Sequence, residues 1–131
     1  MTERVTTTSE DGFVATSDID GYTIEIDGAG EETPGTIAHL LATYATCYVP
    51  ALRVGAQQRD AGDLGAIQID VTGELNDDDK LQEVSFDIST DADLSGDQAA
   101  AVINRADALC KVHDALKPSL HAAVTINGET V

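Results

Sequence analysis

Two cysteines are the residues of this sequence best suited to redox or nucleophilic chemistry. Cys47 and Cys110 are the only thiols among 131 residues, and their spacing matches no zinc-binding pattern. The thiolate is the nucleophilic form of cysteine, so catalysis would need a partly accessible thiol beside a proton acceptor or a cation. A cysteine on an apolar face is more often a small, inert core residue. The sequence leaves both a reactive pair and an inert pair open.

Few other side chains are placed to assist a thiol or to line a pocket beside one. The candidates are Glu31, Glu32, Tyr44, Tyr48 and His113. The glutamates precede the helix predicted around Cys47, the tyrosines flank Cys47, and the histidine follows Cys110 by one turn. As aromatic residues on an apolar helix face, the tyrosines belong to the core by default. Three scattered histidines make no metal site, and no nucleotide-binding or serine-hydrolase motif occurs, so we predict neither a metal nor an organic cofactor.

Cys47 lies in the middle of a long helix predicted from Thr33 to Gly62. Apolar residues recur there at steps of three and four, the spacing that lines one face of an α-helix. Pro50 removes one helical hydrogen bond and clashes with the preceding turn, so we expect a kink beside Cys47. The apolar face must be covered by the rest of the chain.

Cys110 ends the apolar stripe of a second predicted helix. The stripe consists of Ala99, Val102, Ile103, Ala106, Leu109 and Cys110. Ser95 is expected to cap this helix, with Gln98 completing a capping box. The stretch 91–97 also resembles half of a calcium loop, but Val102 stands where the closing glutamate belongs, so we prefer the cap. Because both cysteines lie on buried stripes, the pattern favours a meeting of the two thiols, and whether they are in contact stays open.

Alternating apolar and polar residues predict six strands around these helices. The strands are expected at Arg4–Ser9, Phe13–Ser17, Tyr22–Asp27, Ile67–Glu74, Val84–Thr90 and Leu120–Ile126. Asp11-Gly12 and Asp20-Gly21 are hairpin dipeptides between the first three. The order β-β-β-α-β-β-α-β favours an α+β fold with a largely antiparallel sheet and helices on one face. We expect a single domain over residues 1–131, a short helical turn at 111–117, and an exposed His121.

The charge of the chain excludes several classes of partner. Its 24 acidic residues against 7 basic ones give a formal charge of −17, which repels phosphate backbones and anionic membranes. Acidic residues spread along the chain are typical of salt-adapted proteins, in which screening limits their mutual repulsion. No apolar run reaches the roughly 20 residues that span a bilayer, and no secretory signal pattern opens the chain. We therefore expect a soluble cytoplasmic protein that binds neither nucleic acid nor membrane.

Three stretches, taken in order, carry a resemblance to a known family. They are LLATYATC ending at Cys47, the strand pair Ile67–Glu74 and Val84–Thr90, and ADALCKVHDALKP around Cys110. In this arrangement the chain resembles the OsmC/Ohr proteins (osmotically inducible protein C and organic hydroperoxide resistance protein), which are thiol-dependent peroxidases. The resemblance implies an OsmC-like intertwined homodimer that needs no metal or organic cofactor. It also implies that Cys47 is oxidised by an organic hydroperoxide, and that Cys110 resolves it into a disulfide that a dithiol reductant reopens.

Two family positions differ in this sequence. Family peroxidases use a glutamate near the start of the helix and an arginine before it, whereas Ala38 occupies the aligned glutamate position and no arginine lies between Arg4 and Arg53. Without a cation, the pKa of Cys47 is expected to stay near the ordinary ~8.5, or above it if the thiol is buried. The alternative function is a non-catalytic protein of the same fold that binds a small apolar ligand between the Tyr44/Tyr48 face and the sheet.

Overall fold

The computed structural model describes residues 1–131 as two compact units, Met1–Leu40 and Leu41–Val131. The helix α1 (Thr36–Gln58) runs from the first unit into the second. The single domain expected over residues 1–131 stays a prediction. No helix of the chain is both long enough and apolar enough to cross a membrane.

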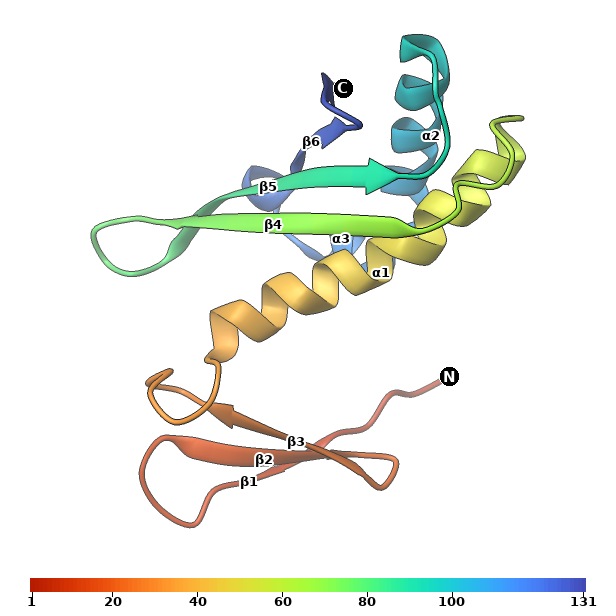
Figure 1. Ribbon diagram of the computed structural model, residues 1–131. Coiled ribbons are helices and arrows are strands. Elements are labelled where there is room, and N and C mark those ends of the chain that lie inside the picture. Colours follow the sequence, from red (N-terminus) through yellow and green to blue (C-terminus); the bar gives the residue numbers. More distant parts are fainter. The chain divides into compact units, whose positions relative to one another are not determined.

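The first unit is a three-stranded antiparallel meander followed by the start of α1 (Figure 1). Its strands are β1 (Thr6–Thr8), β2 (Val14–Ile19) and β3 (Tyr22–Asp27). Asp20 and Gly21 both have positive φ, 51° and 87°, and form the tight turn predicted between β2 and β3. β3 has the predicted bounds, whereas β1 is shorter than expected and β2 lies one to two residues further along the chain.

The loop after β3 is organised by a buried carboxylate. Asp27 is 3% exposed and accepts the backbone N–H groups of Ala29, Glu31 and Glu32 at 2.8, 3.0 and 2.8 Å. The N–H bonds from Glu32 and Ala29 contribute most to lowering the pKa of Asp27, against the opposing effect of burial. The Glu31 and Glu32 side chains themselves are exposed.

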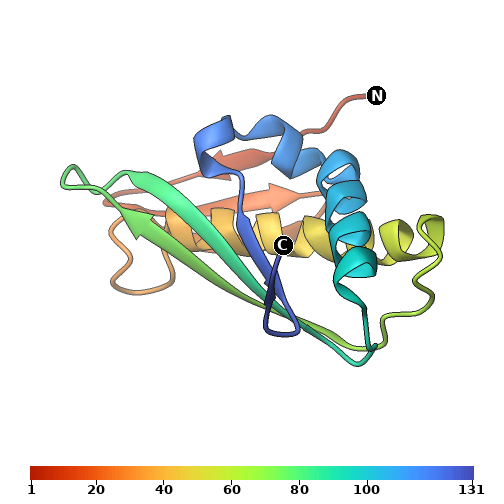
Figure 2. The ribbon, with the colours of Figure 1, turned by 90° about the horizontal axis from the view of Figure 1, so that it is seen from above.

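The second unit builds helices onto a four-stranded sheet of order β4-β5-β6-β7 (Figure 1, Figure 2). Its elements after α1 are β4 (Ile67–Leu75), β5 (Leu81–Thr90), α2 (Gly96–Leu109), α3 (Lys111–Ala115), the 3-10 turn η1 (Pro118–Leu120), β6 (Ala123–Ile126) and β7 (Glu129–Thr130). The β4–β5 and β6–β7 pairs are antiparallel, but β5 and β6 are parallel. The chain returns from β5 through α2, α3 and η1, and such a crossover is what joins parallel neighbours.

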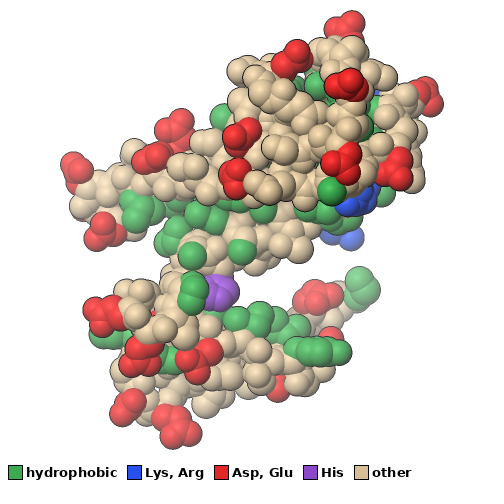
Figure 3. Space-filling model, viewed as in Figure 1, with side chains coloured by type: hydrophobic (Ala, Val, Ile, Leu, Met, Phe, Trp, Pro, Cys, Tyr) green, Lys and Arg blue, Asp and Glu red, His purple; other side chains and the backbone are tan.

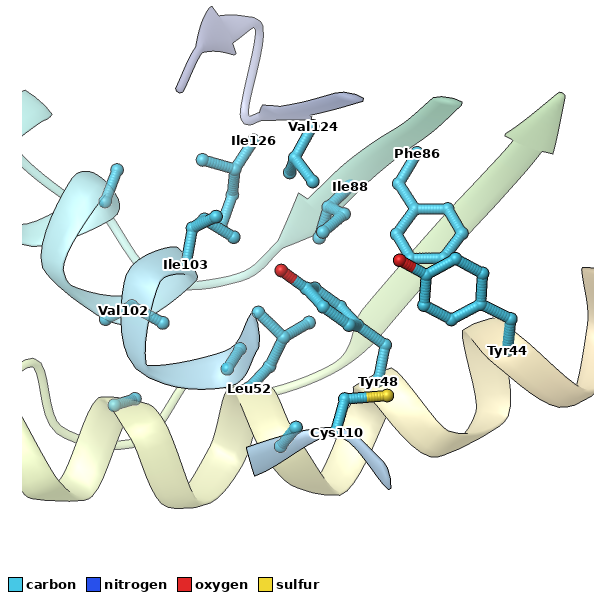
Figure 4. Packing of buried hydrophobic residues seen from close by; sticks show 14 of the residues in the cluster. Tyr44, Tyr48, Leu52, Phe86, Ile88, Val102, Ile103, Cys110, Val124 and Ile126 are labelled. Atoms are coloured by element: carbon cyan, nitrogen blue, oxygen red, sulfur yellow. The ribbon is translucent and has the colours of Figure 1, made fainter. Parts of the chain in front are cut away.

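The core of the second unit lies between the sheet and the helices α1 and α2. Figure 4 shows side chains of these helices facing those of β5 and β6, as the amphipathic stripes predicted. At Gly55 of α1, a Cβ atom would lie 3.2 Å from the carbonyl oxygen of Val102 in α2, so the two helices approach closely there. The Ser95 capping box is confirmed, since Ser95 Oγ accepts the N–H of Gln98 and Gln98 Oε1 accepts the N–H of Ser95.

The long helix is confirmed with shorter ends than expected. It begins at Thr36 rather than Thr33 and continues through Pro50 to Gln58, four residues before Gly62. Acidic side chains are spread over the visible face of both units, with few basic ones among them (Figure 3). The mixed α+β architecture follows the predicted order, with the added β7 and a separate α3.

Candidate active site

The two thiols of the chain meet in the second unit. Cys47 projects from the middle of α1 and is partly exposed, whereas Cys110 is 1% exposed between α2 and α3. Both cysteines are free, and the two thiols are neighbours, each shifting the pKa of the other. The sequence left contact between the thiols open, and the structure places them near each other.

Cys110 is fixed by the two helices that it joins. Its backbone N–H donates to the carbonyl of Ala106 at 2.9 Å, which ends α2. Its Sγ accepts the backbone N–H of His113 at 3.5 Å, which makes Cys110 the N-cap residue of α3. The buried sulfur is therefore held in one place by the start of the next helix.

The surroundings of Cys47 favour its thiolate. Burial by itself would raise the pKa of Cys47, but this effect is outweighed by the backbone N–H of Val112, the thiol of Cys110, and the backbone N–H and charge of Lys111. The pKa of Cys47 is consequently lowered. The expectation of an ordinary or raised pKa is wrong, because the donors come from residues 111–112, far along the chain from the helix start where the family glutamate would lie.

The partner thiol is shifted the other way. Burial raises the pKa of Cys110 most, and its bond to Cys47 adds to the rise, while the N–H of His113 opposes it. Cys110 thus keeps its proton and donates it toward the Cys47 sulfur when Cys47 is ionised. The two shifts make Cys47 the more readily ionised of the two thiols.

A largely apolar cavity of about 330 Å³ opens beside the partly exposed thiol. It is lined by Cys47, Pro50, Ala51, Val54, Leu109 and Lys111. Apart from the Cys47 sulfur, Lys111 provides the one polar side chain of this lining, and it is exposed. The cavity can hold an apolar group of a ligand next to the sulfur.

The two tyrosines lie in the core and do not line this cavity. Tyr44 and Tyr48 are 1% and 0% exposed, and both rings pack on Phe86, with centroids at 4.6 and 5.1 Å (Figure 4). Tyr48 Oη donates to Asp107 Oδ1 at 2.7 Å, and Tyr44 Oη is hydrogen-bonded to His113 Nδ1 at 2.9 Å. Their place is the core position expected of aromatic residues on an apolar stripe.

His113 belongs to this buried polar group and does not reach into the cavity lining. Burial, opposed by the negative charge of Asp107, lowers the pKa of His113, which favours the neutral ring. The ring of His121 stacks on that of His113 with centroids 3.7 Å apart, and His121 Nε2 lies 3.1 Å from the carbonyl oxygen of Leu116. The expectation of an exposed His121 is wrong, since this stacking half-buries it.

Glu31 and Glu32, which the sequence offered as helpers of a thiol, are exposed residues of the first unit. Arg53 is exposed on α1 and donates to the carbonyl of Gly65 at 2.7 Å. Sequence reasoning missed Lys111 and Val112, and the available signal was their position directly after a cysteine that ends one helix and begins another.

Comparison with known proteins identifies the family. The model of the OsmC-like protein family matches residues 19–125. The chain belongs to the OsmC-like family. An uncharacterized protein of Haloferax volcanii is 44% identical over 126 residues, which cover 96% of each chain. The source of this relative is consistent with the salt adaptation expected from the acidic composition.

Two solved structures show the same fold at low sequence identity. A putative osmotic stress induced and detoxification response protein from Psychrobacter arcticus matches with a TM-score of 0.80 and 18% identity, covering 97% of this chain and 96% of that one. The organic hydroperoxide resistance protein OhrB of Bacillus subtilis matches with a TM-score of 0.71 and 20% identity, covering 97% and 98%. The OsmC-like fold expected from the sequence is confirmed.

Proposed function

We propose that this protein reduces organic hydroperoxides through its two thiols, with Cys47 as the peroxidatic and Cys110 as the resolving cysteine. The observation that carries the proposal is the contact between the two thiols, in which the pKa of Cys47 is lowered and that of Cys110 is raised. Membership of the OsmC-like family and the hydroperoxide resistance named for the Bacillus subtilis relative support it.

The proposed reaction begins at the Cys47 thiolate. The sulfur attacks the distal oxygen of the hydroperoxide, so that an S–O bond forms, the O–O bond breaks, and the alkoxide leaves and takes up a proton as the alcohol. Cys47 becomes a sulfenic acid. Cys110 then loses its proton and attacks the Cys47 sulfur, forming the disulfide and releasing water. A dithiol reductant reduces the disulfide by exchange and is itself oxidised to a disulfide.

The cavity beside Cys47 supports an apolar substituent on the hydroperoxide. Its lining residues Pro50, Ala51, Val54 and Leu109 offer hydrocarbon contacts, which favour an organic hydroperoxide over hydrogen peroxide. Lys111 of the same lining offers a cation near the thiolate, the role that the family resemblance gives to an arginine. Neither a metal nor an organic cofactor takes part in these steps.

We further propose that the protein works as a homodimer in the cytoplasm of a salt-adapted organism. The first unit exposes large apolar side chains, with Val5 56%, Phe13 76%, Ile19 37%, Tyr22 80% and Ile24 40% exposed. The register of β2 and β3 puts Ile19, Tyr22 and Ile24 on one face of the meander. Such a patch favours an interface, here with a second copy. Sedimentation at high salt tests this proposal, and a monomer at all concentrations would refute it.

The second candidate function is binding of a small apolar ligand without turnover, favoured by the apolar lining of the cavity. It predicts ligand-dependent thermal stabilisation that persists in Cys47→Ser. Stabilisation lost together with the thiol would speak against simple binding.

Titration with cumene hydroperoxide separates these functions. One equivalent of oxidant should convert two free thiols into one intramolecular disulfide, and Cys47→Ser should abolish turnover with a dithiol. Cys110→Ser should still consume one equivalent and retain a Cys47 sulfenic acid that a sulfenic-specific reagent traps. Survival of both thiols in the folded protein under oxidant would refute the peroxidase.

A further inference from the structure

The two tyrosines that flank Cys47 reach the segment that carries Cys110, one on each side of it. Tyr44 lies three residues before Cys47 and bonds His113, which lies three residues after Cys110. Tyr48 lies one residue after Cys47 and bonds Asp107, which lies three residues before Cys110. The helix of one cysteine is thereby tied to both ends of the segment 107–113 around the other.

Breaking either hydrogen bond would be costly. Tyr44 and Tyr48 are 1% and 0% exposed, so a hydroxyl that lost its partner could not form a hydrogen bond with water instead. Tyr44 Oη also accepts the backbone N–H of Ala122 at 3.0 Å, which fixes the oxygen from the side of β6. Figure 4 shows both tyrosine rings projecting from α1 to the same side, against Phe86 of β5.

The segment between the two ties contains the groups that act on the Cys47 sulfur. Lys111 lines the same cavity as Cys47, and the backbone N–H of Val112, the thiol of Cys110 and the backbone N–H of Lys111 lower the pKa of Cys47. These residues belong to the end of α2 and to α3, a helix of only five residues. Cys110 is buried in the core and Val112 packs against it, so the two hydroxyl bonds act together with this packing to set the distance of the turn from the sulfur.

We propose that Tyr44 and Tyr48 are positioning residues: through His113 and Asp107 they hold the 110–112 turn against Cys47, and so set the reactivity of this thiol and its pairing with Cys110. The inference rests on the proposed function in that it takes Cys47 as the reactive thiol. It gives a role to the hydroxyl oxygens of the two tyrosines, which the packing of their rings in the core does not require.

The test removes these oxygens and keeps the rings. Tyr44→Phe and Tyr48→Phe are compared with Thr43→Val, which also removes a hydroxyl, at an exposed residue of α1 outside the proposed dimer patch. Cys47 is alkylated with iodoacetamide over a range of pH, and peptide mass spectrometry separates its labelling from that of Cys110. We expect the pH midpoint to rise by up to about one unit in the two buried variants, which is about tenfold less thiolate below the midpoint. Thr43→Val should match the wild type.

Asp107 provides a second test at a residue that tolerates substitution, because its side chain is 37% exposed. Asp107→Asn keeps an oxygen acceptor for the Tyr48 hydroxyl, whereas Asp107→Ala removes it. Both variants lose the negative charge of Asp107, and this loss by itself lowers the pKa of a neighbouring thiol. The difference between the two variants therefore isolates the hydrogen bond. The midpoint of Asp107→Ala should lie above that of Asp107→Asn.

Alkylation uses no hydroperoxide, so this result is independent of whether the protein turns over peroxide. The proposal is overturned if the two buried variants keep the wild-type midpoint, even when their melting temperatures fall, because the hydroxyls would then contribute to stability alone. Equal midpoints for Asp107→Asn and Asp107→Ala would overturn the Tyr48 arm in the same way. A folded Tyr48→Phe with a raised midpoint supports it.

Discussion

Replacing Cys110, the proposed resolving cysteine, should also raise the pKa of Cys47, the proposed peroxidatic cysteine. Cys110 donates a hydrogen bond to the Cys47 thiolate, and its own Sγ accepts the N–H of His113. Cys110→Ala removes both interactions. Cys110→Ser keeps a hydroxyl that can donate to the thiolate and can cap α3, so the two variants form a matched pair. Each variant retains Cys47 as its single thiol, which makes labelling unambiguous.

The size of the effect follows from the burial of Cys110. The residue is 1% exposed, so bulk water does not replace the missing donor in the alanine variant. A hydrogen bond to a charged group contributes about 1.5–3 kcal/mol, and a thiol is a weak donor, so about 1.5 kcal/mol is appropriate here. Since one pKa unit corresponds to about 1.36 kcal/mol, the pKa of Cys47 should rise by about one unit in Cys110→Ala.

The assay is the rate of iodoacetamide alkylation of Cys47 against pH in the two variants. Below the midpoint the alanine variant should hold about tenfold less thiolate than the serine variant. The rate at high pH should differ little, or slightly favour alanine, because a more basic thiolate is a better nucleophile. The midpoint is therefore the decisive quantity. Equal midpoints in the two variants would refute the argument that Cys110 supports the Cys47 thiolate.

Three further changes test other parts of the structure. Lys111→Met should raise the pKa of Cys47 by a few tenths of a unit at low salt and by less at high salt. The reason is that the interaction energy of an exposed charge is only about 0.2–1 kcal/mol and is screened by salt. Alkylation of Cys47 at two salt concentrations measures the shift. Leu52→Ala, at a residue 0% exposed, should lower the free energy of unfolding by about 2–5 kcal/mol in denaturant titrations, and Val54→Ala, at 40% exposure, by under about 1 kcal/mol. Stability should fall as pH drops below about 6.5, because the lowered pKa of His113 leaves the unfolded chain binding more protons, and His113→Gln should reduce this slope in thermal melts.

Much of the fold could be predicted from local sequence pattern. The alternation of Val84, Phe86 and Ile88 fixed both the strand and its buried face, and the Ser95 box fixed the start of α2. The parallel β5–β6 pairing could not be predicted, because it depends on where a crossover returns the chain. β7 was missed although Asn127-Gly128 marks its turn, since a two-residue strand has no periodicity to detect.

Part of the candidate site could likewise be predicted from the sequence, and part could not. The stripes of apolar residues could predict that Cys47 and Cys110 both lie on the buried faces of their helices, which favours their approach. The lowered pKa of Cys47 could not be predicted, since its causes include backbone N–H groups that any residue type would present. The stacking of His121 on His113 was likewise hidden, because strand parity applies only where β6 begins, at Ala123.

The placement of the tyrosines makes the protein its own optical probe. The chain has no tryptophan and three tyrosines, of which Tyr22 is exposed and Tyr44 and Tyr48 are buried on either side of the reactive thiol in the sequence. Near-ultraviolet dichroism arises mainly from aromatic rings held in a fixed, asymmetric setting, so the two buried rings should dominate that signal. Formation of the disulfide next to them would then be visible in real time, without any attached label.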